Sequence, residues 1–322
     1  MLVFSVALIV GLVILIWSAD RFVEGAVSTA LHLGMTPMLV GLTVVAFGTS
    51  APELIVSAMA ALQDSSNLAV GNAIGSNIAN IALVLGLTTL VSAIPIKLGI
   101  LRVELPILLI ATSLATLVII DGTIVFYDGL ILSGLLIISL IALAKLSSSS
   151  EELPEEIDEA SDIPQAKAYL YLIGSIVALV LSSRMLVWGA SGIATELGVS
   201  DLIIGLTIVA IGTSLPELAA SIASALKGHH DLALGNIIGS NLFNLLAVMA
   251  IPAFISPPII DQVSLFRDYG FMLVLTFGLA ILCLVNHVSK RDQIGKIAGI
   301  TLLCSYIVYL VILYKDSVTA LA

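Results

Sequence analysis

The sequence predicts an all-α polytopic membrane protein, with ten transmembrane helices arranged as two inverted repeats of five. Three observations support this fold class: the composition, ten apolar runs of membrane-spanning length, and one long segment that occurs twice. Of the 322 residues, 59% are hydrophobic and 11% are charged, and the mean hydropathy is +1.18. Soluble proteins have about 45–50% apolar and about 25% charged residues, so a soluble enzyme is disfavoured.

The ten apolar runs are separated by short stretches of Gly, Pro and polar residues, as expected of loops. A helix needs about 20 mostly apolar residues to cross a bilayer. The first run has no basic segment before it and no clean cleavage site after it, so we expect a retained helix rather than a signal peptide. The predicted spans are 2–30, 37–62, 68–92, 103–120, 126–146, 168–193, 200–226, 231–255, 268–286 and 296–314.

Most of the net negative charge lies in the segment 147–167, whose Ser, Pro and acidic residues are typical of a disordered linker. We therefore expect a first five-helix repeat at 1–146, this acidic linker, and a second repeat at 168–322. The net charge is −10, and without the seven acids of the linker it is −3, which gives no basic surface for nucleic acid. Those acids are Glu151, Glu152, Glu155, Glu156, Asp158, Glu159 and Asp162.

The basic residues predict the orientation, because cytoplasmic connections are enriched in Lys and Arg. With both termini outside and the linker in the cytoplasm, eight basic residues lie on the cytoplasmic side and two outside. The eight are Lys97, Arg102, Lys145, Lys167, Lys227, Lys290, Arg291 and Lys296, and the two are Arg267 and Lys315.

The duplicated segment is the most informative feature of the chain. Residues 39–80 align with residues 203–244 at a constant offset of 164, and 23 of the 42 positions are identical without a gap. Each half then holds five helices. Because five is odd, the second half enters the membrane in the opposite sense, and transporters built this way bind their substrate near the midplane.

Each repeat carries a G-T-S-x-P-E motif, at 48–53 and at 212–217. A proline inside a helix removes a hydrogen bond and disfavours helical geometry in the residue before it. We therefore expect the second and seventh helices to break just before Glu53 and Glu217. Carbonyls freed near 46–49 and 210–213 would need a partner in hydrocarbon, and a bound cation can be that partner.

Glu53 and Glu217 lie near the middle of their spans, where a charge costs at least about 2.5–3.5 kcal/mol and defaults to a functional role. Neither motif contains Lys or Arg, so two such carboxylates would repel unless a cation or protons lay between them. All donors in the motifs are oxygens, which suit Ca²⁺ or Na⁺ rather than zinc or copper. Cys283 and Cys304 have no metal-site spacing.

A second repeated motif, G-N-x-x-G-S-N-x-x-N, occupies 71–80 and 235–244. Its spacing places three polar residues on one helix face, as the first motif does. The serines of both motifs suit an ion ligand or an interhelical hydrogen bond equally well, whereas the glycines suit close packing, and we expect Ser57 and Ser221 to bond backbone carbonyls. The faces are Ser50, Glu53, Ser57 and Asn72, Ser76, Asn80, repeated as Ser214, Glu217, Ser221 and Asn236, Ser240, Asn244.

In these motifs the chain resembles the calcium/cation antiporter superfamily, specifically the prokaryotic sodium/calcium exchangers. The resemblance implies two inverted five-helix halves, an ion core of helices two, three, seven and eight, and a sliding element of helices one and six. It implies antiport of Ca²⁺ against Na⁺ in the plasma (inner) membrane of a prokaryote. The partners are then the lipid bilayer and the transported ions, with no cofactor, nucleic acid or obligatory protein partner.

The resemblance also implies the ligands of a cation site. Calcium would bind the carboxylates of Glu53 and Glu217 and the carbonyls of Thr49 and Thr213. Sodium sites would use hydroxyls and two carbonyls, with two amides completing the cluster: Ser50, Ser214, Ser76, Ser240, Ala46, Ala210, Asn80 and Asn244. Some relatives carry Asp at the position of Asn244, so this site has a charge of −2 and a weaker case for potassium co-transport.

Three alternatives stay open. A proton/calcium antiporter would use the same two glutamates as proton carriers. An intramembrane protease also places acids in the bilayer, but no GxGD, HExxH or GxSG-type motif is present, and we expect no enzymatic activity. A passive channel would carry calcium without a counter-ion.

Overall fold

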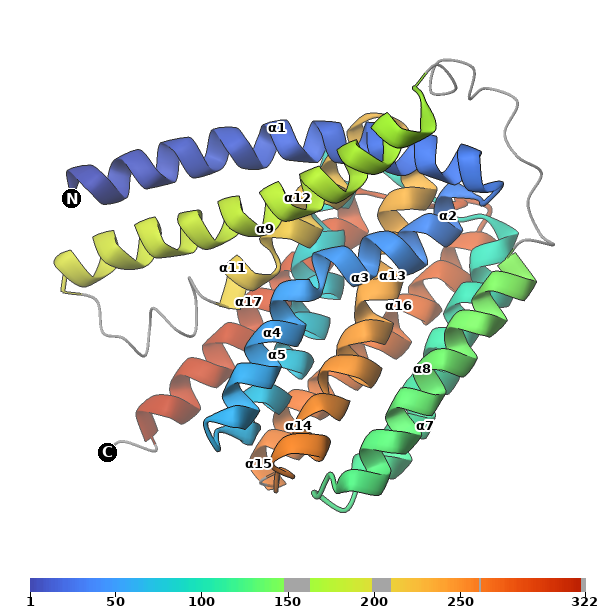
Figure 1. The fold of residues 1–322 in the computed structure, drawn as a ribbon. Helices are drawn as coiled ribbons and strands as arrows, with labels where there is room; N and C mark the ends of the chain where they lie inside the picture. Colours follow the sequence, from blue (N-terminus) through green and yellow to red (C-terminus); the bar gives the residue numbers. More distant parts are fainter. Residues whose placement is uncertain (148–162, 199–209, 261, 320–322) are drawn as a thin grey trace.

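The computed structural model describes residues 1–147, 163–198, 210–260 and 262–319. Within these residues, eight continuous helices are long and apolar enough to span a membrane, and one bent helix pair makes up to nine. The chain is therefore a polytopic helical membrane protein. Figure 1 shows these helices packed as one bundle, with two long helices lying obliquely across one end.

The first half runs through five predicted spans, and each contains helices close to the expected positions. Its elements are α1 (Leu2–Leu33), α2 (Pro37–Val40), η1 (Gly41–Val45), α3 (Ala46–Thr49), α4 (Ala51–Leu62), α5 (Ser66–Ala79), η2 (Asn80–Leu85), α6 (Gly86–Val91), β1 (Ile94–Pro95), η3 (Ile100–Glu104), α7 (Leu105–Ile119) and α8 (Phe126–Ser147). The segments labelled η are single stretches of π-helix inside longer helices.

The second half repeats this order. Its elements are α9 (Gln165–Glu196), α11 (Ala210–Thr213), α12 (Leu215–Leu226), α13 (His230–Phe243), η6 (Asn244–Val248), α14 (Ala250–Ile255), α15 (Gln262–Ser264), η7 (Leu265–Tyr269), α16 (Gly270–Val288), β2 (Gln293–Ile294) and α17 (Lys296–Thr319). The predicted span 200–226 is described from residue 210 onward, and most of the predicted linker 147–167 lies outside the described residues.

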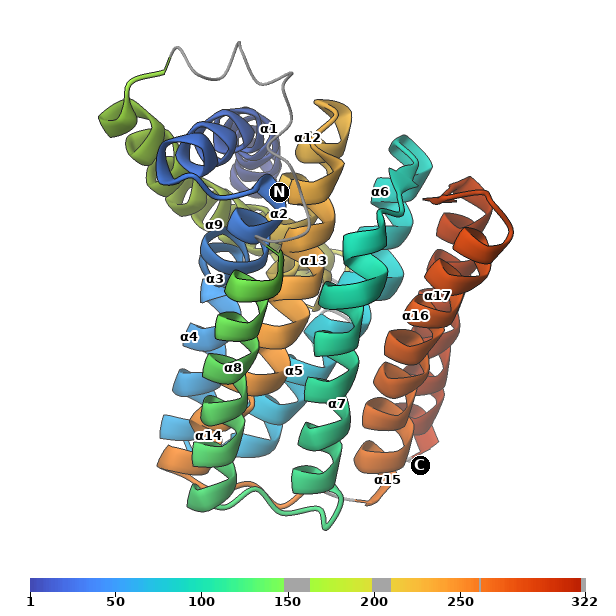
Figure 2. The same ribbon diagram turned by 90° about the vertical axis from the view of Figure 1, so that its right-hand side faces the viewer.

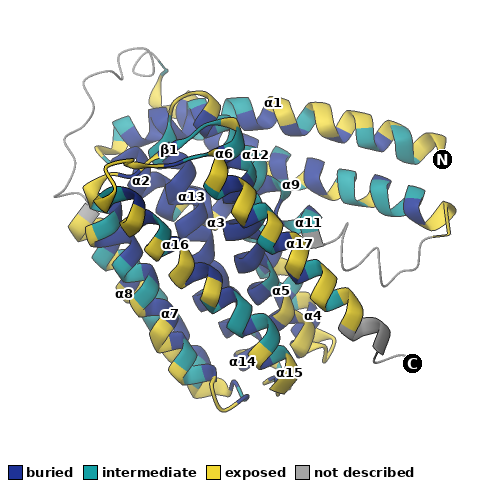
Figure 3. Cartoon of the chain, turned by 180° about the vertical axis from the view of Figure 1, so that it is seen from behind, coloured by how far each residue is buried: buried dark blue, intermediate teal, exposed yellow. Residues whose placement is uncertain are grey.

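Two equivalent helices form the centre of the bundle. In the most apolar stretch of the span Ser66–Val91, 72% of residues are buried, and in that of His230–Ile255 the share is 83%. The outer spans are much less buried, at 22–44%. Figure 3 shows the exposed residues gathered on outer helices such as α8, α16 and α17. Because most of these exposed side chains are large and apolar, they suit contact with lipid.

The helices α1 and α9 pack antiparallel along each other, as Figure 1 shows. Glycines allow this close approach, because a Cβ atom at Gly25 would strike the backbone of Leu172 and one at Gly189 would lie 2.9 Å from the carbonyl oxygen of Phe4. The pair is therefore held by backbone-to-backbone packing at both of its ends.

Contacts between the connections divide into two groups, at opposite ends of the bundle (Figure 2). At one end β1 pairs antiparallel with β2, and Lys97 forms an ion pair with Asp231. At the other end Thr123 forms an isolated bridge with Ile259. Successive connections along the chain thus lie at opposite ends of the bundle, as expected if each span crosses the membrane once.

Candidate ion-binding site

The proline of each G-T-S-x-P-E motif breaks its helix as predicted. The first helix of each pair ends at Thr49 or Thr213, and the next one begins directly after Ser50 or Ser214. Both serines have non-helical backbone angles, with φ/ψ of −81°/4° and −88°/7°. In the first repeat the axes of Pro37–Thr49 and Ala51–Leu62 differ by 42°. Each break leaves the following glutamate in the first turn of a new helix.

Glu53 and Glu217 are both completely buried, and a serine donates to each of them. The Ser76 hydroxyl lies 3.4 Å from Oε1 of Glu53, and the Ser50 hydroxyl lies 3.3 Å from Oε1 of Glu217. Ser50 belongs to the first repeat and lies at the helix break, three positions before Glu53. Its bond to Glu217 is therefore a direct contact between the two repeats.

The first asparagine of each second motif forms a hydrogen bond between its own helix and the preceding helix, which carries the glutamate. Asn72 donates to the carbonyl oxygen of Glu53 at 3.2 Å, and Asn236 donates to that of Glu217 at 3.3 Å. The side-chain nitrogen of Asn236 also donates to the Ser221 hydroxyl at 3.0 Å, and the side-chain oxygen of Asn236 accepts from the Thr49 hydroxyl at 3.0 Å. The bond from asparagine to the glutamate carbonyl thus occurs in both repeats, and the bond between Thr49 and Asn236 joins one repeat to the other.

The remaining predicted residues lie around this centre. The Thr49 hydroxyl is 3.4 Å from that of Ser240, again across the repeats. The Ala46 carbonyl is not left free by the helix break, because it accepts the Ser50 N–H at 3.0 Å and lies 3.4 Å from the Thr49 hydroxyl. Ala210 and Thr213 begin and end α11 as Ala46 and Thr49 begin and end α3.

Seven buried polar atoms at the centre have no hydrogen-bond partner within the described part of the chain. They are Oε2 of Glu53, Oε2 of Glu217, both amide atoms of Asn80, both amide atoms of Asn244, and the hydroxyl of Ser214. Buried polar groups in proteins are almost always hydrogen-bonded. Six of the seven form pairs at the repeat offset of 164, so the unpartnered atoms recur with the symmetry of the sequence.

Lys227 and Arg21 form ion pairs with other carboxylates. Lys227 lies 2.6 Å from Oδ1 of Asp20, and Arg21 lies 2.8 Å from Oε2 of Glu24. Over the described ranges, neither Glu53 nor Glu217 forms an ion pair with Lys, Arg or His. The site can therefore compensate its negative charge with a mobile cation.

Of the secondary predictions, some are confirmed and others are wrong. Ser57 donates to the carbonyl of Val248 at 2.9 Å as predicted, whereas Ser221 accepts from the Asn236 amide instead of bonding a backbone carbonyl.

The close packing predicted for the glycines of the second motif differs between the repeats. It is confirmed for Gly239, where a Cβ atom would lie 2.5 Å from the Leu42 carbonyl oxygen. It is wrong for Gly71 and Gly75, whose ideal Cβ positions have no described atom within 4 Å.

The π-helical segments were not predicted. Two of them, η2 and η6, begin at Asn80 and Asn244, and π-helical turns are frequent at functional sites. Because both repeats contain the same one-residue bulge, aligning one repeat with the other gives no gap that would reveal it. The only available signal is therefore the asparagine itself, which is a weak helix former at the centre of an apolar helix.

Buried twin carboxylates, broken helices and a doubled oxygen cluster in a polytopic bundle define a membrane cation transporter. The family profile described as sodium/calcium exchanger protein matches residues 3–145 and 167–315. The chain therefore belongs to the sodium/calcium exchanger family, and it is a prokaryotic-type calcium/cation antiporter. This family transports Ca²⁺ and Na⁺ across a membrane.

Individual relatives agree with this membership. The chain is 44% identical over 321 residues to a provisionally named antiporter CaxA of Alkalimonas amylolytica, covering 98% of this chain and 100% of the relative. It is 39% identical over 321 residues to the inner membrane protein YrbG of Escherichia coli, covering 98% of each. A solved structure of the sodium-calcium exchanger NCX_Mj, soaked with Na⁺ and Sr²⁺, superimposes with a TM-score of 0.83 at 31% identity, covering 96% of this chain and 98% of that one.

Proposed function

We propose that the protein exchanges Ca²⁺ for Na⁺ by alternating access, through one shared site near the bilayer midplane. The observation that carries this proposal is the presence of two fully buried carboxylates with no basic partner in the described residues, one of which accepts from Ser50 of the other repeat. Two negative charges match one divalent ion or two monovalent ions. A resident basic side chain would instead satisfy the carboxylates permanently.

The proposed calcium ligands are the carboxylates of Glu53 and Glu217 and the carbonyls of Thr49 and Thr213. Ca²⁺ takes six to eight oxygens with flexible geometry, which the unpartnered carboxylate and amide oxygens support. The proposed sodium sites flank this centre and share the two carboxylates. Their further ligands are Ser50, Ser214, Ser76, Ser240, Asn80, Asn244 and the carbonyls of Ala46 and Ala210.

Coupling then follows from competition for the glutamates. Ca²⁺ and Na⁺ cannot both hold Glu53 and Glu217, so loading one ion releases the other. An occupied site is electrically compensated, and the protein can move between its inward-facing and outward-facing states. An empty site keeps two bare charges in a medium of low dielectric, which raises the energy of the intermediate and prevents leak.

We further propose ten spans in two inverted halves, with both termini outside and the linker in the cytoplasm. The alternation of contacts at the two ends of the bundle supports this arrangement. The α1–α9 pair is the proposed moving element. A Cβ atom at Gly48 would meet Ile176, and one at Gly212 would meet Val187, so α9 covers both helix breaks and its displacement would change access to them.

The test is flux into proteoliposomes under an imposed gradient of sodium, potassium or protons, one at a time. An outward sodium gradient should drive uptake of radioactive calcium, and Glu53→Gln or Glu217→Gln should abolish it. Glu196→Gln is the matched control, because Glu196 is an exposed helix-end residue that pairs with the chain's amino group. Uptake driven only by a proton gradient would select the proton/calcium antiporter instead, and tracer flux without any counter-ion would indicate a channel.

A further inference from the structure

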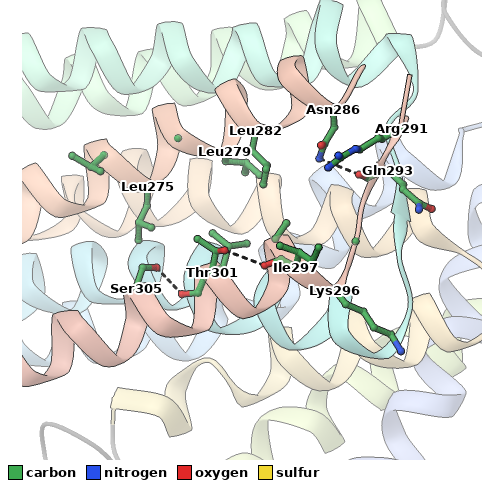
Figure 4. A pocket seen from close by; sticks show the side chains of 15 residues that line it. Leu275, Leu279, Leu282, Asn286, Arg291, Gln293, Lys296, Ile297, Thr301 and Ser305 are labelled. Atoms are coloured by element: carbon green, nitrogen blue, oxygen red, sulfur yellow. Dashed lines mark hydrogen bonds between the residues drawn. The ribbon is translucent and has the colours of Figure 1, made fainter. Parts of the chain in front are cut away.

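A cavity of about 660 Å³ lies between α16 and α17, away from the carboxylate pair. It is lined by both helices and by the connection between them, and Figure 4 shows its side chains. Its volume falls within the range of about 300–1,000 Å³ that is typical of small-molecule sites. None of the proposed ion ligands lines it, so ion transport does not explain it.

Most of the cavity wall is apolar. The hydroxyls that line it are already satisfied by their own helix, because Thr301 donates to the Ile297 carbonyl at 3.0 Å and Ser305 to the Leu302 carbonyl at 2.6 Å. They therefore offer no donor to a ligand. The rest of this wall is aliphatic, including Leu275, Leu279, Leu282 and Leu302.

One end of the cavity is polar and cationic. Arg291, Lys296, Asn286 and Gln293 line it where the two helices are connected, as Figure 4 shows. The only acid of this connection, Asp292, is paired with His287 at 2.7 Å. In the part of the chain that the structure describes, neither Arg291 nor Lys296 forms an ion pair, so this connection carries two positive charges without a carboxylate partner.

The connection is held in place rather than left free. The Asn286 amide donates to the Gln293 carbonyl at 3.1 Å, and β2 pairs with β1. The residues on both sides of Arg291 have left-handed backbone angles, with φ of 56° at Lys290 and 43° at Asp292. Strained backbone of this kind clusters at binding sites, and here it fixes Arg291 at the cavity.

The depth of the cavity matches one leaflet of a membrane. Its lining on α16 runs from Val274 to Asn286, which is about 18 Å along a helix that rises 1.5 Å per residue. Half of a hydrocarbon core is about 15 Å. An acyl chain lying in the cavity would therefore reach the midplane while its headgroup stayed at the basic connection.

We propose that this cavity binds an anionic glycerophospholipid, with its phosphate at Arg291 and Lys296 and an acyl chain between α16 and α17. Basic pockets between transmembrane helices bind anionic headgroups elsewhere. A free phosphate ion would use only the cationic end and would leave the apolar wall exposed, so the lipid is the occupant that both halves of the cavity fit.

The test is retention of phosphatidylglycerol, measured by native mass spectrometry after purification in detergent and titration with the lipid. Arg291→Gln combined with Lys296→Gln should weaken binding about 30-fold, at about fivefold for each charge. Lys290→Gln is the matched control, because Lys290 lies in the same connection but does not line the cavity; it should change binding by less than twofold.

A second variant fills the cavity without touching its charge. Gly278 lines the cavity and has no described atom within 4 Å of its ideal Cβ position, so the Cβ of Gly278→Leu meets no clash and the larger side chain should displace the acyl chain. Gly174→Leu, also unobstructed but on α9, is its control. Excess inorganic phosphate should not displace the lipid, and phosphatidylcholine should not replace it.

Three results would overturn the proposal. These are equal retention of phosphatidylglycerol by the wild type and the double variant, equal retention of phosphatidylcholine, or an equal loss of binding in Lys290→Gln. Displacement by inorganic phosphate would show an anion site instead. Each readout is lipid binding, so it is independent of ion transport.

Discussion

Gly239 makes a tight contact with the other repeat and directly precedes Ser240, one of the proposed ligands. In Gly239→Ala the new Cβ atom would lie 2.5 Å from the carbonyl oxygen of Leu42 and 2.6 Å from Cβ of Ala46. Ordinary contact begins at 3.4 Å, so α13 must move away from η1 and α3 by roughly 1 Å, at a cost of about 1–3 kcal/mol. The movement also separates Ser240, the next residue, from Thr49.

Two measurements follow from this displacement. Thermal unfolding in detergent should show a lowered midpoint for Gly239→Ala, and sodium-driven calcium uptake should fall by at least about tenfold, because misplacement of about 1 Å at a reacting site can cost 100-fold. Gly174→Ala is the control, since its Cβ position is unobstructed. Unchanged stability and uptake in Gly239→Ala would refute the inference that this contact positions the site.

The remaining predictions separate packing from ligation and test the orientation. Ser57→Ala removes an interhelical hydrogen bond to a carbonyl, which should cost about 0.6 kcal/mol of stability without changing the sodium dependence of uptake. Ser76→Ala loses a contact to Glu53 and should raise the sodium concentration needed for half-maximal uptake. Identical sodium curves for the two variants would count against the proposed ligands. For the orientation, Lys290→Cys should react with an impermeant maleimide only after cells are permeabilised, and Asp121→Cys should react in intact cells. The opposite pattern would reverse the proposed topology.

Much of the fold could be predicted because the bilayer imposes its own length on each helix. Apolar runs of about 20 residues marked the spans, and prolines marked the breaks at Ser50 and Ser214, since proline cannot complete the helical ladder. The pairing of β1 with β2 could not be predicted. It joins residues some 200 positions apart, Ile94 and Ile294, through strands of two residues, which carry no periodicity of their own.

For the candidate site, the sequence predicts which residues to consider but not the contacts between them. The repeat identified Glu53 and Glu217, because intramembrane carboxylates without basic partners have few structural roles. It did not predict that Ser50 would bond the glutamate of the other repeat, or that Asn236 would join three groups while Asn72 is recorded with one. Such differences depend on how the two halves pack in one particular state, and an alignment of identical motifs contains no information on that state.

Equilibrium binding of radioactive calcium to the purified protein tests the shared site most directly. Sodium should displace the bound calcium with a Hill coefficient greater than one, whereas choline at equal ionic strength should leave the calcium bound. Glu53→Gln or Glu217→Gln should weaken calcium binding by more than about 100-fold, since breaking a buried charge pair costs about 3–5 kcal/mol. Calcium that stays bound in high sodium, or that binds both variants as tightly as the wild type, would contradict a common site at the two glutamates.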